Sequence, residues 1–260
     1  MSFGRLLNRL LSLLDLKLTR LPAGPRRAYD QDGLTSFHNH DFIGESDFSR
    51  AYARGVEAAG SDYRWHWRVH VALWVAHRAL DLAGDFVECG VNRGFLSSAI
   101  MQYLDWNRQE RDYYLLDTFS GLDERYVSRA ELDSGILRRN QEKLRSGFYV
   151  DGVDAVRENF SEWPRARLVV GSIPESLPQV VLERVAFLHL DLNCSPPEIA
   201  ALDHFWPSLS PGAFVLLDDY GYAGFETQRA PMDDWARDHR LSVLSLPTGQ
   251  GLIQKPHRQS

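Results

Sequence analysis

Short apolar segments alternate with helical segments from about residue 84 onward, and this alternation restricts the fold more than any other feature. Between the apolar segments, apolar residues recur at helical spacing. Strands that are separated by helices pair in parallel, and helices then cover both faces of the sheet. The sequence therefore predicts an α/β fold. The expected strands are residues 85–89, 112–119, 166–172, 185–193 and 212–221.

The end of the chain predicts a different kind of pairing. Residues 241–247 and 251–256 are both apolar, and only a short turn around Gly249 separates them. Two strands joined by such a turn must run antiparallel. We therefore expect a mostly parallel sheet that ends in an antiparallel strand.

The pattern of the first third of the chain predicts helices and no strand of this sheet. Leucines recur at helical spacing in residues 3–21, with arginines and lysine between them. We favour a helix packed on the body or on a second subunit, and contact with a membrane surface is the alternative. We expect an N-terminal helix and linker (1–27), a helical segment on the acceptor side (28–82) and a main domain (83–260). Within the second part, His38 and His40 are candidates for facing the acceptor.

Composition excludes several classes of protein. The net charge of −6 argues against a general nucleic-acid binder, which usually carries a basic surface. Cys89 and Cys194 are the two cysteines, too few for a disulfide framework, so we expect a reducing, cytoplasmic location. No run of about 20 apolar residues is present to span a membrane.

The expected strands end in a set of mostly acidic residues. In an open parallel sheet, ligands bind in the crevice at the carboxyl ends of the strands. Ionised carboxylates crowded into one crevice repel each other unless cations or hydrogen-bond donors are present. We therefore expect this crevice to take a positively charged ligand, a metal, or both. The residues are Glu88, Asp117, Ser172, Asp191, Asp218 and Asp219.

The turn after the first of these strands distinguishes between cofactors. A dinucleotide site needs a second glycine two residues after the first, and residues 88–94 have only Gly90 and Gly94. Glu88 also stands before the turn, where it would oppose a pyrophosphate. S-adenosylmethionine fits better, because it has no phosphate and carries an ammonium and a sulfonium.

Each part of S-adenosylmethionine can be matched to a strand end. The backbone at Gly90 can lie against the methionyl part, and Glu88 can receive the ammonium. Asp117 suits the ribose diol, as an acid does in dinucleotide folds. Ser172 is placed to meet the adenine. The full set expected to bind this cofactor is Glu88, Cys89, Gly90, Gly94, Asp117, Thr118, Ser172 and Asp191.

Several blocks of sequence, in the same order along the chain, resemble the macrocin O-methyltransferase (TylF-like) family. The resemblance implies a Rossmann-like class I methyltransferase fold with seven strands, the last one antiparallel. It also implies methyl transfer to a hydroxyl, often on a sugar, assisted by a divalent metal. The matching blocks are VECGVNRG (87–94), LLDTFSGLDE (115–124), VRENF (156–160), VVGSIPESLP (169–178), LHLDLN (188–193) and LSPGAFVLLDDYG (209–221).

The resemblance also suggests the residues that do the chemistry. Carried over onto this chain, the metal ligands are Asp191, Asp218 and Asp219, and oxygen ligands favour Mg²⁺. The family commonly has a second acid in the block that holds Asp191, and here that residue is Asn193. A metal would lower the pKa of the acceptor hydroxyl, and Asp191 is our candidate for the general base.

These observations leave more than one function open. The leading prediction is a homo-oligomeric, S-adenosylmethionine-dependent O-methyltransferase that acts on a sugar, a glycan or a sugar-bearing metabolite. One alternative acts on another small-molecule hydroxyl, such as a catechol. Another is a protein that binds S-adenosylmethionine without catalysis, although all three candidate metal ligands are present.

Overall fold

The computed structural model describes residues 28–257, and the chain divides into two compact units after Asp41. The described part of the smaller unit holds an antiparallel hairpin of β1 (Tyr29–Gln31) and β2 (Leu34–Ser36). The amphipathic helix predicted for residues 3–21 lies outside the described residues. His38 and His40 belong to the smaller unit, and their place at the acceptor stays a prediction.

A seven-stranded sheet forms the centre of the larger unit, in the order β5-β4-β3-β6-β7-β9-β8. The first five of these strands run parallel, and β9 runs antiparallel to both β7 and β8. The predicted mostly parallel sheet with an antiparallel strand near its end is therefore confirmed. The bounds are β3 (Asp85–Cys89), β4 (Tyr113–Asp117), β5 (Ala166–Val170), β6 (Val185–Leu190), β7 (Leu209–Leu217), β8 (Leu244–Ser245) and β9 (Gly251–Gln254).

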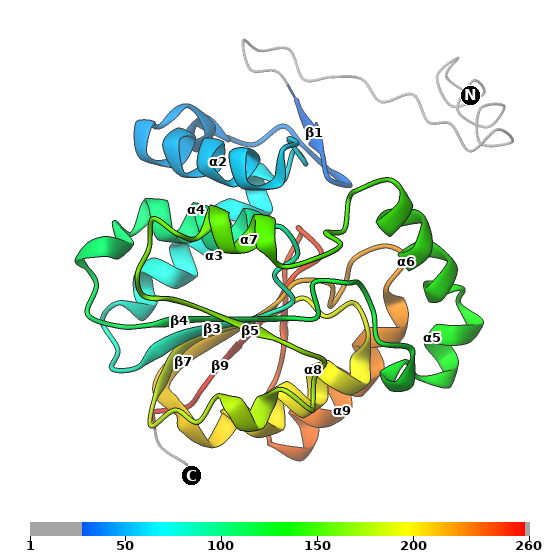
Figure 1. Ribbon diagram of the computed structural model, residues 1–260. Helices are drawn as coiled ribbons and strands as arrows, with labels where there is room; N and C mark the ends of the chain where they lie inside the picture. Colours follow the sequence, from blue (N-terminus) through cyan, green and yellow to red (C-terminus); the bar gives the residue numbers. More distant parts are fainter. Residues whose placement is uncertain (1–27, 258–260) are drawn as a thin grey trace, which may run out of the picture. The chain divides into compact units, whose positions relative to one another are not determined.

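Helices cover both faces of this sheet (Figure 1), as the uninterrupted apolar strands predict. One face packs against α3 (His66–Ala79) and α4 (Phe95–Tyr103), and the other against α8 (Ser195–Phe205) and α9 (Glu226–Asp238). Adjacent strand residues alternate between the faces: Phe86 belongs to the first core and Val87 to the second. No helix of the described residues is long and apolar enough to cross a membrane.

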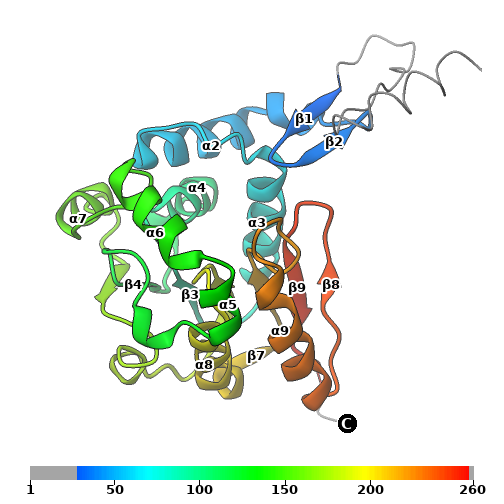
Figure 2. The same ribbon diagram turned by 90° about the vertical axis from the view of Figure 1, so that its right-hand side faces the viewer.

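The remaining helices are shorter or lie further from the sheet. Figure 2 shows α5 and α6, which belong to the segment between β4 and β5, and shows α9 near the edge formed by β8 and β9. Their bounds are α2 (Ser46–Ala59), α5 (Arg129–Asp133), α6 (Ile136–Arg145), α7 (Asp154–Asn159), η2 (Asp41–Gly44), η3 (Trp106–Arg108), η4 (Glu124–Tyr126), η5 (Leu177–Gln179) and η6 (Trp206–Ser208).

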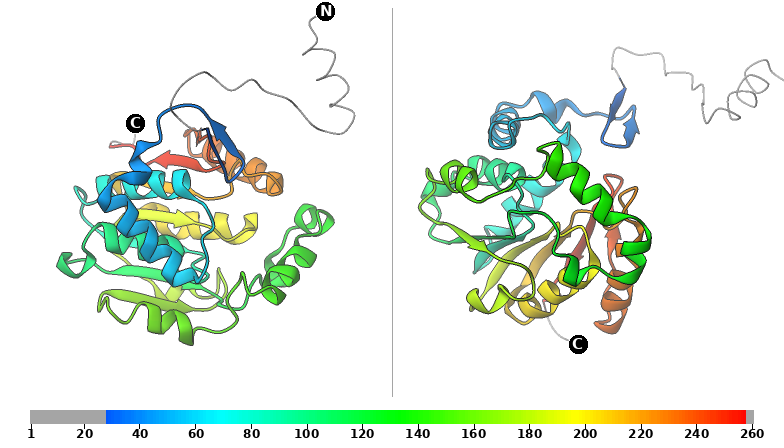
Figure 3. Two further views of the ribbon diagram at one scale, coloured as in Figure 1. Left: turned by 90° about the horizontal axis from the view of Figure 1, so that it is seen from above. Right: turned by 45° about the vertical axis from the view of Figure 1, so that its right-hand side comes forward.

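The segment of residues 28–82 was predicted to be helical, but it begins with the β1–β2 hairpin and then holds two separate α-helices. Gly60 ends α2 in the left-handed conformation, with φ of 68°, and α3 begins only at His66. α2 packs against α4 (Figure 3), and α3 packs against β6 and β7. These helices thus belong to the same unit as the sheet, and the predicted boundary at residue 82 falls inside that unit.

The carboxyl ends of β3, β4 and β6 are drawn together at the point where the strand order reverses. The amide of Gly90 donates to the carbonyl of Leu116, and the amide of Asp191 donates to the carbonyl of Cys89, each at 2.8 Å. Gly90 has a φ of 93°, and a Cβ there would lie 1.9 Å from the carbonyl oxygen of Asp191. Only glycine allows the two strand ends to approach this closely.

Candidate functional site

A cavity of about 470 Å³ opens at these strand ends, a volume suited to a small-molecule ligand. The structure brings together around it all the polar residues that the sequence placed at the ends of the strands. Of all the residues predicted to bind the cofactor or a metal, those that line the cavity are Glu88, Gly90, Asp117, Thr118, Ser172, Asp191, Asp218 and Asp219.

Two residues predicted to bind the cofactor, Cys89 and Gly94, do not line the cavity, and their contact with the cofactor stays a prediction. Alternation along β3 points the side chain of Cys89 away from Glu88, into the core beneath α8 and α9, where it is fully buried. Gly94 begins α4 with φ of 83°, and a Cβ there would lie 2.5 Å from the ring of Phe160. Its role is to allow close packing of α4.

Glu88 is held by a histidine that the sequence analysis left without a role. His189 lies beside Glu88 in the register of β3 and β6, and its Nδ1 is 3.0 Å from Glu88 Oε1. Its Nε2 lies 3.7 Å from Asp218 Oδ1. Burial opposes the charged ring, but Asp218 and Glu88 raise the pKa of His189 to about 10. The pairing of neighbouring strands was the signal that could have identified this contact.

The second oxygen of Glu88 lacks a partner. Glu88 is 2% exposed, and its Oε2 is buried with no hydrogen bond to any described residue. An unsatisfied buried carboxylate oxygen is costly in free energy. Its position on the cavity wall fits a ligand that donates a hydrogen bond, as an ammonium group does.

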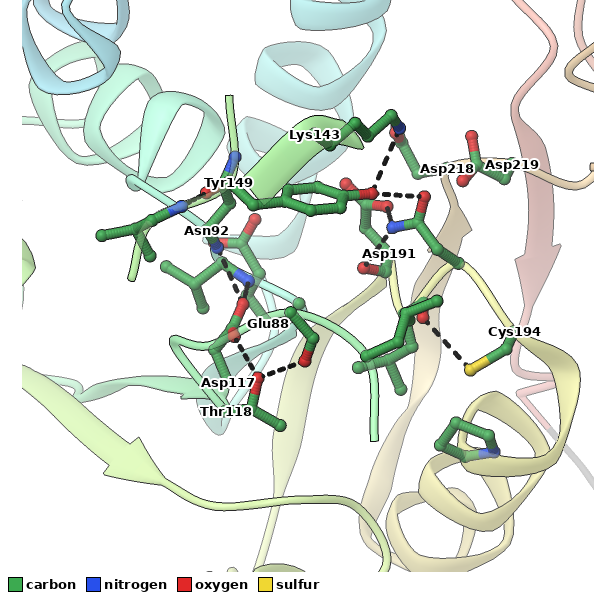
Figure 4. A pocket seen from close by; sticks show the side chains of 18 of the residues that line it. Glu88, Asn92, Asp117, Thr118, Lys143, Tyr149, Asp191, Cys194, Asp218 and Asp219 are labelled. Atoms are coloured by element: carbon green, nitrogen blue, oxygen red, sulfur yellow. Dashed lines mark hydrogen bonds between the residues drawn. The ribbon is translucent and has the colours of Figure 1, made fainter. Parts of the chain in front are cut away.

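Asp117 organises the turn that follows β3. Its Oδ2 accepts hydrogen bonds from the amides of Val91 and Asn92, at 2.7 and 2.8 Å, and its Oδ1 accepts one from the amide of Phe119 at 2.7 Å. The carboxylate therefore ties the Gly90 turn to the end of β4 (Figure 4). Because each carboxylate oxygen has two lone pairs and Oδ2 already accepts two hydrogen bonds, the remaining acceptor capacity of Asp117 lies on Oδ1.

The Ser172 hydroxyl already forms a hydrogen bond with another residue of the cavity wall. It donates to Asp123 Oδ2 at 2.6 Å, and Arg125 holds the same carboxylate. The hydrogen bond from Arg125 lowers the pKa of Asp123 well below its usual value. Asp123 was not among the predicted site residues, although it lies within the block of residues 115–124.

A chain of hydrogen bonds joins the irregular segment after β4 to the end of β6 (Figure 4). Lys143 Nζ donates to the Tyr149 hydroxyl at 3.1 Å, and that hydroxyl donates to Asn193 Oδ1 at 3.2 Å. Asn193 Nδ2 in turn donates to Asp191 Oδ1 at 3.0 Å. Asn193 thus holds Asp191 in place, and burial raises the pKa of the Tyr149 phenol well above its usual value.

The acidic pair at the end of β7 faces a buried arginine. Arg68, from α3, forms an ion pair with Asp218 Oδ2, and its Nη1 lies 3.9 Å from Asp219 Oδ1. Burial opposes ionisation, yet Arg68 and His189 hold the pKa of Asp218 below its usual value. Burial, followed by the charge of Asp218, raises the pKa of Asp219 to about 7. Burial also raises the pKa of Asp191 well above its usual range.

The predicted metal ligands Asp191, Asp218 and Asp219 line one cavity, but their surroundings do not fit a metal. Arg68 occupies one carboxylate oxygen of Asp218, and Gln250 Nε2 donates to the other at 3.2 Å. Among residues 28–257, no cluster of three or more His, Cys, Asp or Glu side chains has the arrangement of a metal site.

Comparison with known proteins decides the family. Residues 72–243 match the macrocin O-methyltransferase (TylF) family. The chain belongs to this family. The match takes in β3 to β7 and α9, and so includes every strand end that lines the cavity.

Characterised members of the TylF family are similar to about half of the chain. It is 29% identical over 145 residues to the 8-demethyl-8-(2,3-dimethoxy-α-L-rhamnosyl)-tetracenomycin-C 4'-O-methyltransferase of Streptomyces olivaceus, covering 53% of each chain. It is 28% identical over 148 residues to the mycinamicin III 3''-O-methyltransferase of Micromonospora griseorubida, covering 53% of this chain and 55% of the relative. The chain thus spans about half the length of these relatives.

A solved structure shows the same fold. The O-methyltransferase NovP superposes with a TM-score of 0.60 at 21% identity, over 73% of this chain and 79% of that one. This likeness confirms the predicted class of fold.

Proposed function

We propose that the protein transfers a methyl group from S-adenosylmethionine to a hydroxyl of a sugar or of a sugar-bearing small molecule. Membership of the TylF family supports the reaction. The names of both similar enzymes describe O-methyltransferases, and the name of one specifies a rhamnosyl compound. The observation that carries the proposal is the unsatisfied Glu88 Oε2 in the cavity at the end of β3.

The strand ends provide a binding group for each part of the cofactor. Glu88 receives the ammonium, and the backbone at Gly90 lies against the methionyl part. Asp117 takes a ribose hydroxyl with the lone pair left on its Oδ1, while Thr118 and Ser172 lie toward the adenine. Each of these residues lines the cavity, so a single ligand can reach them all.

The other side of the cavity suits a sugar ring. Aromatic side chains present flat apolar faces there, and the C–H face of a sugar can pack against such a surface. These aromatic side chains come from segments outside the strands of the sheet. They are Tyr63, Trp65, Phe148, Tyr222 and Phe225.

The reaction needs alignment and a proton acceptor. When bound, S-adenosylmethionine supplies a methyl group on a sulfonium, which is already a good leaving group. The cavity holds the acceptor hydroxyl in line with that methyl group. Asp191, at the end of β6 and oriented by Asn193, takes the proton from the hydroxyl as general base.

Cofactor binding is the direct test of this proposal. We expect calorimetry to show that S-adenosylhomocysteine binds the wild-type protein, and that Glu88→Gln weakens binding by about 10- to 100-fold, the loss of a hydrogen bond to a charged group. Glu110→Gln, which changes an exposed glutamate outside the cavity, serves as the matched control. Well-folded wild-type protein that does not bind S-adenosylhomocysteine would refute the proposal.

The acceptor class is tested separately by methyl transfer. We expect transfer from labelled S-adenosylmethionine to rhamnosylated or otherwise glycosylated small molecules, and none to the matching aglycones. Transfer to a catechol but to no sugar would favour the alternative acceptor. The cytoplasmic location, the homo-oligomer and the membrane contact through residues 3–21 stay predictions.

A further inference from the structure

The acidic end of the cavity needs positive charge. Asp191, Asp218 and Asp219 all line the cavity, and Asp218 and Asp219, which follow β7, are almost fully buried. Buried carboxylates are stable only when cations or hydrogen-bond donors compensate them. The described residues supply such a group directly, because Arg68 reaches the acidic pair from α3.

Arg68 is buried and fixed by several contacts, unlike a mobile arginine on the protein surface. Only 3% of the residue is exposed. Its Nη1 donates to the carboxylate of Asp218 and, at 3.2 Å, to the carbonyl oxygen of the same residue. Its guanidinium also lies over two aromatic rings, 4.4 Å from the centre of Tyr222 and 5.3 Å from that of Trp65.

These contacts compete with a metal for the same atoms. A hard divalent ion needs several oxygen ligands with free lone pairs at close range. Asp218 already gives one oxygen to Arg68 and the other to Gln250. An ion at this carboxylate would also meet the charge of a guanidinium, which stays protonated in proteins.

We propose that Arg68 takes the place of a divalent metal in this protein. Asp218 and Asp219 then bind no metal as long as Arg68 is paired with them. Arg68 acts here as a positioning residue that fixes the two carboxylates at the acceptor end of the cavity. The inference rests on the proposed function only in assuming that the methyl acceptor binds in this cavity. The state of the acidic pair can be measured without any methyl acceptor.

Manganese binding tests the inference. Free Mn²⁺ has an electron paramagnetic resonance signal that falls when the ion is bound, so the full-length protein can be titrated directly. We expect wild-type protein to bind no stoichiometric Mn²⁺ at micromolar concentrations. We expect Arg68→Met, which keeps an apolar stem but removes the charge, to gain one site. Adding Asp218→Asn to Arg68→Met should abolish that site.

Control variants distinguish a wrong inference from a variant that merely fails to fold. Arg54→Met removes another arginine, one that pairs with Glu162 outside the cavity, and should gain no Mn²⁺ site. One equivalent of Mn²⁺ on wild-type protein, lost in Asp218→Asn, would overturn the inference even if Arg68→Met does not fold. A folded Arg68→Met variant that gains no site would overturn it as well.

A parallel measurement keeps this test distinct from that of the proposed function. We expect wild-type protein to bind S-adenosylhomocysteine equally well with a chelator and with added Mg²⁺. Binding that requires Mg²⁺ would contradict the inference about Arg68. Absence of binding under both conditions would count against the methyltransferase proposal, while the Mn²⁺ titration would still decide the role of Arg68.

Discussion

Gly90→Ala should lower the free energy of unfolding by more than the backbone strain of replacing a glycine alone would. The new Cβ would lie 1.9 Å from the carbonyl oxygen of Asp191 and 2.5 Å from its carbonyl carbon, and both atoms are backbone. The backbone of β6 would have to move, which costs about 1–3 kcal/mol for overpacking. A φ of 93° adds about 1–2 kcal/mol for a residue with a Cβ.

The expected loss in the free energy of unfolding is therefore about 2–5 kcal/mol. Urea unfolding followed by circular dichroism measures it. Gly60→Ala is the matched control, because Gly60 has a φ of 68° but no atom within 4 Å of an added Cβ. It should lose only the backbone part, about 1–2 kcal/mol. Equal losses in the two variants would refute the argument that close approach of β3 and β6 requires glycine.

Three further substitutions test other parts of the site. Asn92→Ala should weaken S-adenosylhomocysteine binding in calorimetry, because the Asn92 side chain bonds the backbone of Phe148 and Val150 and so holds the cavity wall. Glu131→Ala should lower the free energy of unfolding by about 2–4 kcal/mol in urea titrations, because it orphans two backbone amides that its buried carboxylate now binds. Cys89→Ala should lower it by about 1 kcal/mol and leave binding of S-adenosylhomocysteine unchanged, since its side chain packs in the core.

The strands and the position of the cavity could be predicted because burial leaves a strong signal. A strand covered on both faces is apolar throughout, and the first polar residue after it marks the end that faces solvent or a ligand. Glu88, Asp117 and Asp191 were found in this way. The motif spacing could not show which residues of the turn face the cavity, and Cys89 and Gly94, which the motif also suggested, do not line it.

The residues that the sequence did not reveal come from segments outside the strands. Lys143 lies on α6 and Tyr149 on the loop after it, within a stretch whose pattern predicted little beyond partial helix. Arg68 lies on α3, where its neighbours indicate only a buried helix. A helical pattern shows which face is apolar, but not which distant strand end that face will meet.

Arg68 lies at the same acidic cluster as Asn193, the residue at which the sequence departs from the pattern that the family resemblance implies. Asn193 is neutral where the family commonly has a second acid, so the cavity carries one negative charge fewer. A guanidinium in place of a divalent ion carries one positive charge fewer. Both residues lie at the same acidic cluster of Asp191, Asp218 and Asp219. Asn193 has also kept a positioning role, because its amide donates to Asp191 at 3.0 Å. The substitution at 193 and the position of Arg68 are therefore consistent with a single change in how the acidic cluster is neutralised.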